Sequence, residues 1–360
     1  MPRKSMKIIK LSILFLFIFW LNAQSVVNQF RVPIYLTPSI TLGYDSNFLR
    51  LSEIDKTNAS SEPSMLGDSK TFDSEIIRPE LKLQYSPVFS TKHETNFIIN
   101  LASAVFGQSK NKSYSSYFIR FEQHLGPYQW LKIGYSLQPE LLLRYYEDRD
   151  IIAFIQADST RLLPCTFSNE TIYISYSYPI LKKTWLRLKG KKNNQYYNEN
   201  FTEFDTDIFS GEIRLTTSYF RKNKFTIFFE NGIGTNISYN TGLLTTELDR
   251  SHKYIQFGGL WAYYPSKFLK SVVLYFTNNQ RTYLGEDIHD PLHGGREHED
   301  IQIQIRLQKK LVPNFEVELR GKFRTRKVFS EFEWVEELKS FNRYEFSMKI
   351  SYSTHLNLLY

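Results

Sequence analysis

The chain of 360 residues combines a low mean hydropathy of −0.37 with an aromatic-rich composition of 29 Phe and 24 Tyr residues. Its formal charge is +8, but four positive charges lie within the first 23 residues, and the remaining excess of about +4 gives no argument for a nucleic-acid partner. Cys165 is the single cysteine, so an intrachain disulfide is excluded.

The N-terminus has the three parts of a secretory signal peptide. An apolar run from Ile13 to Leu21 is followed by Asn22 and Ala23 and is preceded by a basic head, which consists of Arg3, Lys4, Lys7 and Lys10. The run is shorter than the roughly 20 residues that a membrane-spanning helix needs. We therefore expect residues 1–23 to be a signal peptide and residues 24–360 to form one domain. Because no long apolar stretch follows, a helical membrane protein is also excluded.

Behind the signal, apolar and polar residues alternate in one segment after another, most clearly from Ile301 to Gln308. Alternation gives an extended strand one apolar and one polar face. About fourteen such segments predict an all-β fold, a transmembrane antiparallel up-and-down β-barrel with aromatic girdles at the two membrane interfaces. The predicted strands are Ile34–Leu49, Phe72–Tyr85, Asn96–Phe106, Tyr117–Leu125, Trp130–Tyr146, Thr171–Tyr178, Trp185–Tyr197, Ile208–Tyr219, Phe225–Tyr239, Tyr254–Tyr264, Val272–Tyr283, Asp300–Leu307, Phe315–Phe329 and Arg343–Tyr352.

The links between these strands alternate in length. Long polar links, such as Leu51–Thr71 and Glu147–Asn169, follow the odd-numbered strands, whereas short ones, such as Gly126–Pro127 and Val312–Asn314, follow the even-numbered strands. A barrel with its N-terminus in the periplasm predicts this sorting, with short inner turns and long outer loops. Cys165 falls in a long link, and we expect it to be an incidental loop thiol.

The signal peptide, the strand pattern and the terminal aromatic residue Tyr360 together resemble bacterial outer-membrane β-barrels of the porin-like kind. Tyr344–Tyr352 looks like the signal that the barrel assembly machinery recognises. Gly43–Asn47 looks like a motif beside a turn in porin-like barrels, including the barrel of surface lipoprotein assembly modifiers, although the helical-repeat domain of those modifiers has no counterpart here. The resemblance implies a place in the bacterial outer membrane, in contact with outer-membrane lipid and lipopolysaccharide, and folding with help from the assembly machinery.

The polar faces of the predicted strands carry about twice as many basic as acidic side chains. Rings of Arg and Lys favour anions in a pore. We therefore predict a lumen-lining set consisting of Arg187, Lys189, Lys191, Arg214, Arg306, Arg320, Lys322, Arg324 and Arg326. The alternative is a solvated wall of mutually paired charges without selectivity.

The predicted loop Glu286–Asp300 contains His289, His293 and His298 among several carboxylates. Imidazole and carboxylate groups this close together could bind a divalent metal or form a hydrolytic His–Asp pair. The spacing matches no fixed ligand motif, so a hydrated surface loop is the alternative.

The link Glu331–Phe341 carries apolar residues at helical spacing, which predicts one short amphipathic helix that packs into the mouth of the barrel or against another loop. An exposed binding patch is the sharper interpretation.

Three functions remain open at this level. The first is a porin-like channel or transporter for small solutes, without a cofactor. The second is an interaction or assembly protein that acts through its outer loops and uses the barrel as an anchor. The third is an outer-membrane hydrolase.

Overall fold

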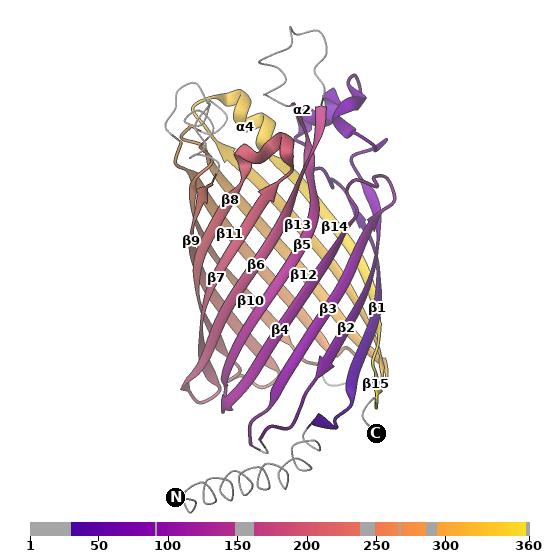
Figure 1. The fold of residues 1–360 in the computed structure, drawn as a ribbon, viewed down its shortest axis with the longest axis vertical. Coiled ribbons are helices and arrows are strands. Elements are labelled where there is room, and N and C mark those ends of the chain that lie inside the picture. The colour runs from indigo at the N-terminus through magenta and orange to yellow at the C-terminus, as the bar shows by residue number, and fades with distance from the viewer. Residues whose placement is uncertain are drawn as a thin grey trace, which may run out of the picture.

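The computed structural model describes residues 30–90, 92–147, 162–237, 249–265, 268–285 and 294–357, and the predicted signal peptide lies outside them. Fourteen long antiparallel strands follow one another in the sheet in the same order as in the chain (Figure 1). They are β1 (Ile34–Asp45), β2 (Ser74–Tyr85), β3 (Thr95–Phe106), β4 (Tyr114–Gly126), β5 (Gln129–Glu147), β6 (Leu162–Leu181), β7 (Thr184–Tyr197), β8 (Thr206–Thr217), β9 (Asn223–Asn236), β10 (His252–Tyr263), β11 (Ser271–Tyr283), β12 (Glu297–Val312), β13 (Phe315–Phe329) and β14 (Phe341–Tyr352).

The sheet closes on itself because β14 pairs with β1, from Asp45 opposite Glu345 to Ser39 opposite Ser351. The short strand β15 (Thr354–Leu356) pairs with the first residues of β1. Closure pairs each of the fourteen long strands with a neighbour on both sides, which is the condition for a sheet to cross a membrane. The predicted up-and-down barrel is confirmed.

The alternation along β12 separates two environments. Ile303 and Ile305 are 51% and 44% exposed, whereas the alternating residues Gln302 and Gln304 line an internal cavity. The same exposed apolar face continues around the barrel through residues such as Ile119, Ile174, Phe209, Ile227, Phe257, Phe276, Leu319 and Phe346. A charge on such a face costs about 2–4 kcal/mol at the bilayer midplane, so this face fixes the register. No helix in the described part of the chain is long and apolar enough to span a membrane.

The predicted sorting of the links is also present. Residues 127–128, 182–183 and 313–314 make short turns at one end, and residues 46–73, 198–205 and 330–340 make longer links at the other. Tyr128 and Lys183 take positive φ angles of 60° and 62° in two of these tight turns. The long-link end carries the helices, which are α2 (Glu53–Asn58), η1 (Pro63–Leu66), η2 (Glu199–Phe204) and α4 (Glu333–Lys339).

β12 runs from Glu297 to Val312 and not from Asp300 to Leu307, and two further predicted boundaries are wrong. Residues 162–170 belong to β6 and not to a loop, because they extend the β5–β6 hairpin with bulges near Gln138 and Leu142. Cys165 therefore lies in a strand, fully buried against Phe201 and Phe204 of η2. The other error is at β1, which ends at Asp45 because the next residues turn into the mouth of the barrel.

Candidate functional site

Five carboxylates on the inward face of the wall each contact two basic side chains. The five shared carboxylates come from β4, β8, β12, β13 and β14. Glu122 contacts Arg120 and Lys132 at 2.8 and 2.7 Å, Glu212 contacts Arg187 and Arg214 at 3.5 and 2.8 Å, Asp300 contacts Arg324 and Arg326 at 3.0 and 2.8 Å, Glu318 contacts Arg306 and Arg320 at 3.9 and 2.6 Å, and Glu345 contacts Lys322 and Arg343 at 2.9 and 2.7 Å. One carboxylate between two cations leaves four of these groups with a net positive charge, whereas the Glu345 group is balanced because Arg343 also contacts Asp45 at 2.6 Å.

The remaining two residues of the predicted lumen-lining set have different neighbours. Lys191 contacts Glu230 at 2.7 Å, and the ammonium group of Lys189 lies 4.6 Å from the centre of the Tyr173 ring. The structure thus brings the nine predicted residues together in small clusters rather than in one ring. Their role in lining a path for solutes stays a prediction.

An internal cavity of about 540 Å³ lies beside strands β1, β2 and β12–β14. Its lining is polar and includes Arg78, Glu80, Arg320, Lys322 and Lys349. Polar groups of this density need water or ion partners, so the cavity is a wet space inside an apolar outer belt. The described residues therefore form a closed antiparallel β-barrel with an apolar outer belt and a polar interior, as expected for a transmembrane β-barrel.

Comparison with known proteins adds the following. No protein-family model matches the sequence, and no curated protein matches it. Among solved structures, the barrel is similar to the anion-selective porin from Comamonas acidovorans, with 8% identity and a TM-score of 0.40 over 89% of this chain and 98% of the porin. It is also similar to OccAB3 from Acinetobacter baumannii, with 8% identity and a TM-score of 0.41 over 90% and 99% of the two chains. A loop-deletion mutant of OmpT from Vibrio cholerae gives 6% identity and a TM-score of 0.44 over 89% and 99%. Resemblance at this level carries no information about function.

The first long link enters the barrel through a hinge at the closure seam. Arg343 of β14 donates two hydrogen bonds to the buried carboxylate of Asp45, at 2.9 and 2.6 Å. Asn47 holds the turn that follows, because its side chain accepts from the backbone N–H of Leu51 at 2.8 Å and donates to the carbonyl of Asn342 at 3.1 Å. Arg50 has a φ of 57° in the same turn. These bonds direct residues 48–51 inward.

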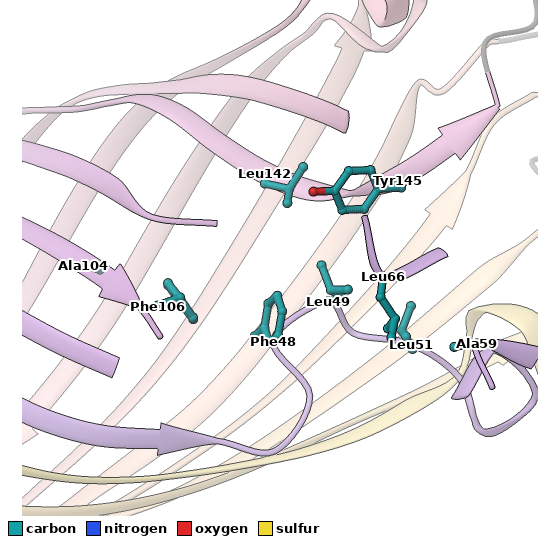
Figure 2. Close-up of a cluster of buried hydrophobic side chains, with 9 residues drawn as sticks. All are labelled: Phe48, Leu49, Leu51, Ala59, Leu66, Ala104, Phe106, Leu142 and Tyr145. Atoms are coloured by element: carbon teal, nitrogen blue, oxygen red, sulfur yellow. The ribbon is translucent and has the colours of Figure 1, made fainter. Parts of the chain in front are cut away.

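We call residues 46–73 the mouth loop, and its inner part packs on the wall. Phe48, Leu49 and Leu51 are fully buried, and they form one cluster with Ala104 and Phe106 of β3, among others (Figure 2). The rings of Phe48 and Phe106 lie 5.7 Å apart. Full burial of a Leu or Phe side chain contributes about 1.5–3 kcal/mol, so the mouth loop is held as a fixed part of the barrel interior.

A polar tether fixes the outer part of the mouth loop. The Tyr145 hydroxyl of β5 donates to Asp68 at 2.8 Å, and Asp68 also accepts from Ser109 at 2.6 Å and from the backbone N–H of Asn111 at 3.0 Å. Burial raises the pKa of Asp68, but these hydrogen bonds outweigh it and hold the pKa below its ordinary value. The Asp68 carboxylate in this tether therefore stays ionised at neutral pH.

The predicted histidine site is only partly within the described residues. His289 and His293 lie outside them. His298 lies in β12 and not in a loop, buried beside Tyr283, with a ring distance of 5.2 Å. Arg281, Arg296 and Arg326 surround it, and no group of three or more potential metal ligands is found within the described ranges. Metal binding by the loop stays a prediction that rests on the other two histidines.

The predicted amphipathic helix is present as α4. Its Val335 is fully buried, Leu338 and Lys339 line a second cavity, and the helix packs against α2 of the mouth loop. Phe332 and Trp334 remain 40% and 49% exposed at the rim. The helix thus packs at the mouth and leaves an aromatic patch outside.

The sequence did not single out Arg50, Asp45, Arg250 or Arg296 as functional. Arg50 and Arg324 line both the wall cavity and the second cavity near the loops. Arg250 and Arg296 come from links next to strand ends, where polarity alone does not distinguish a residue that folds inward. The Gly43–Asn47 motif was the one signal that pointed to the hinge.

Proposed function

We propose that this barrel is a porin-like channel that carries small solutes across the outer membrane and prefers anions. The proposal rests on four carboxylates, Glu122, Glu212, Asp300 and Glu318, that each contact two cations, because each of these groups keeps a net positive charge on the inner wall. A positive wall in a confined space raises the local concentration of anions and lowers that of cations.

The dimensions support a narrow pore. Barrels of eight strands are filled by side chains and those of 16–18 strands enclose an aqueous channel, so fourteen strands lie between these sizes. The mouth loop occupies part of this width at the long-link end. We therefore expect a small conductance and a low exclusion limit.

The test is conductance of the purified barrel in planar lipid bilayers under a KCl gradient. Discrete ohmic steps with a reversal potential displaced toward the chloride equilibrium potential support the proposal. A cation-side reversal potential would overturn the anion preference, and the absence of any steps from correctly folded barrel would overturn the channel itself.

An anchored interaction protein is the second candidate, and one observation favours it. Phe332 and Trp334 of the α4 region are exposed, as is Ile54 of α2, which gives the outer rim an apolar patch. Such patches mark interaction surfaces. The double change F332S/W334S should leave conductance intact in a channel and abolish partner binding in an anchored interaction protein. The hydrolase alternative depends on His289 and His293, outside the described residues.

A further inference from the structure

The strongest unassigned feature is the second cavity, of about 550 Å³, which lies inside the barrel at the end that carries the long links. We call it the mouth chamber. Small-molecule sites in proteins commonly have volumes of about 300–1,000 Å³. The chamber is lined by groups from the mouth loop, β5–β8, β10–β13, η2 and α4, so segments far apart in the sequence meet around it.

Positive charge converges on the mouth chamber from several of these elements. The basic lining residues include Arg50, Arg144, Arg250, Arg281, Arg296 and Lys339. The acidic lining residues are Asp55, which contacts Arg144 at 2.8 Å, and Glu203. Asp300 neutralises part of the charge of Arg324 and Arg326 at the boundary with the wall cavity. Among the described residues, the cations therefore outnumber the carboxylates around this confined space.

Aromatic rings flank several of these cations, including Arg144, which also contacts the Asp55 carboxylate at 2.8 Å. The Arg144 guanidinium and the Lys339 ammonium each lie 5.2 Å from the centre of the Tyr146 ring, and the Arg296 guanidinium lies 4.2 Å from that of Tyr283. A guanidinium that stacks on a ring keeps its N–H edge available for a ligand. The buried Nε atoms of Arg50, Arg144, Arg250 and Arg296 have no hydrogen-bond partner among the described residues.

The ionisation of the chamber cations agrees with this arrangement. Burial, followed by the nearby charges of Arg324, Arg343 and Arg326, lowers the pKa of Arg50 to about 9. Burial also lowers the pKa of Arg250 to about 10. Burial and the neighbouring charges of Arg144, Arg296 and Arg250 hold the pKa of Lys339 well below its ordinary value. A bound anion would relieve both the repulsion and the desolvation.

We infer that the mouth chamber is a binding site for a small organic anion that carries at least two negative charges on a phosphate or on carboxylates and has an uncharged ring or sugar body. Arg250, Arg296 and Lys339 would bind the charged groups of the ligand. A guanidinium group can donate two parallel hydrogen bonds to either a phosphate or a carboxylate. Phe167 and Tyr197, which stack at 5.0 Å, would contact the body. This inference rests on the proposed channel function, to which it adds a solute class and a site where that solute pauses.

The test is calorimetric titration of the full barrel in detergent with glucose 6-phosphate, glucose and inorganic phosphate as probes. We expect saturable binding of glucose 6-phosphate, weaker binding of inorganic phosphate and none of glucose. The double change R250Q/R296Q should weaken glucose 6-phosphate binding about tenfold or more, because each substitution removes a charged hydrogen-bond donor. The single change R296K keeps the positive charge but loses the bidentate geometry, so it should weaken glucose 6-phosphate binding less than R250Q/R296Q does.

The matched control is R221Q, which removes an exposed arginine from the short turn before β9 and should leave binding unchanged. Heat-dependent mobility on a gel checks that each variant forms the barrel. No binding to the wild-type protein, equal binding of glucose, or unchanged affinity in R250Q/R296Q would each overturn the inference. Binding without conductance would retain the chamber and overturn the channel, whereas selective conductance without binding would do the reverse.

Discussion

The mouth of the barrel and the wall beneath it use their inward-facing residues in different ways. At the mouth, the wall residues Ala104, Phe106 and Leu142 are apolar and pack against Phe48 and Leu49 of the mouth loop. Further along the strands, the inward residues are charged and pair with one another, as at Glu212 and Glu318. Apolar packing fixes the position of a segment, whereas paired charges in a water-filled cavity maintain an electrostatic potential without filling the space.

This difference assigns separate tasks to the two regions. In the proposed channel, we expect the mouth loop to limit the width of the opening and the charged wall to select the sign of the ions that pass. Substitutions that alter one region at a time separate the two tasks.

The change R343Q should destabilise the barrel most. It leaves the fully buried Asp45 carboxylate without its two guanidinium hydrogen bonds, at the seam where β1 meets β14. Breaking a buried ion pair by removing one partner typically costs about 3–5 kcal/mol. Urea unfolding followed by tryptophan fluorescence measures the loss. The exposed R221Q serves as control, and equal midpoints for the two variants would contradict this role of the seam.

The change G67A should displace the mouth loop without opening the seam. Gly67 has a φ of 64°, and an added Cβ would lie 1.8 Å from the Tyr145 ring. The backbone strain alone costs about 1–3 kcal/mol, and the ring contact adds to it. We expect a larger single-channel conductance. Gly295 has a φ of 60°, but a Cβ added there would meet no atom of the described residues within 4 Å, so G295A applies similar strain without the contact. Equal conductance in the two variants would count against the mouth loop as the constriction.

The double change K189Q/R306Q should weaken anion preference without altering the mouth. It leaves no carboxylate of the wall without a cation, since Glu318 keeps Arg320 at 2.6 Å and Lys189 lies over a ring. The reversal potential should move toward zero, most clearly at 0.1 M salt, where the screening length is about 10 Å, and least at 1 M, where it is about 3 Å. The control K182Q lies in an exposed turn and should change nothing. A shift of similar size in K182Q would contradict the prediction.

The weakest consequence we expect is a pH dependence of anion binding in the mouth chamber. Lys339 faces Arg144, Arg250, Arg296 and Asp55, and its pKa is held well below the ordinary value, first by burial. Its ammonium group therefore loses its proton as pH rises through a range in which an exposed lysine stays charged. Affinity for glucose 6-phosphate should fall as the solution becomes more alkaline, and K339Q should remove this part of the dependence. An equally steep pH profile in K339Q would contradict the assignment.

The barrel could be predicted from the sequence because each strand repeats a two-residue pattern with a strict physical cause. Side chains that face lipid are apolar, so apolar residues at alternating positions, such as Ile303 and Ile305, indicate the outward face of a strand directly. The parity of the links then gave the direction of the strands. The predicted strand boundaries were wrong where the strands extend beyond the lipid-facing belt. Residues 162–170 are an example, because they continue a hairpin without the alternation seen along the apolar belt.

The mouth could not be predicted in the same way, because its contacts join distant segments. Asp45 and Arg343 are 298 residues apart in the chain, and Asp68 meets Tyr145 across 77 residues. The sequence does not distinguish a loop residue such as Arg50 or Arg250 that points to solvent from one that points into the lumen. Only the closed barrel brings these groups into one chamber.

The change F48A is the sharpest test of whether width and sign are separate properties of this barrel. Removing the buried ring should cost the mouth loop about 3–5 kcal/mol of packing on Phe106 and its neighbours. Conductance and reversal potential are measured together in planar bilayers. We predict a larger conductance with a reversal potential that stays on the anion side. A reversal potential that falls to zero, or a conductance equal to that of the wild-type barrel, would contradict this separation.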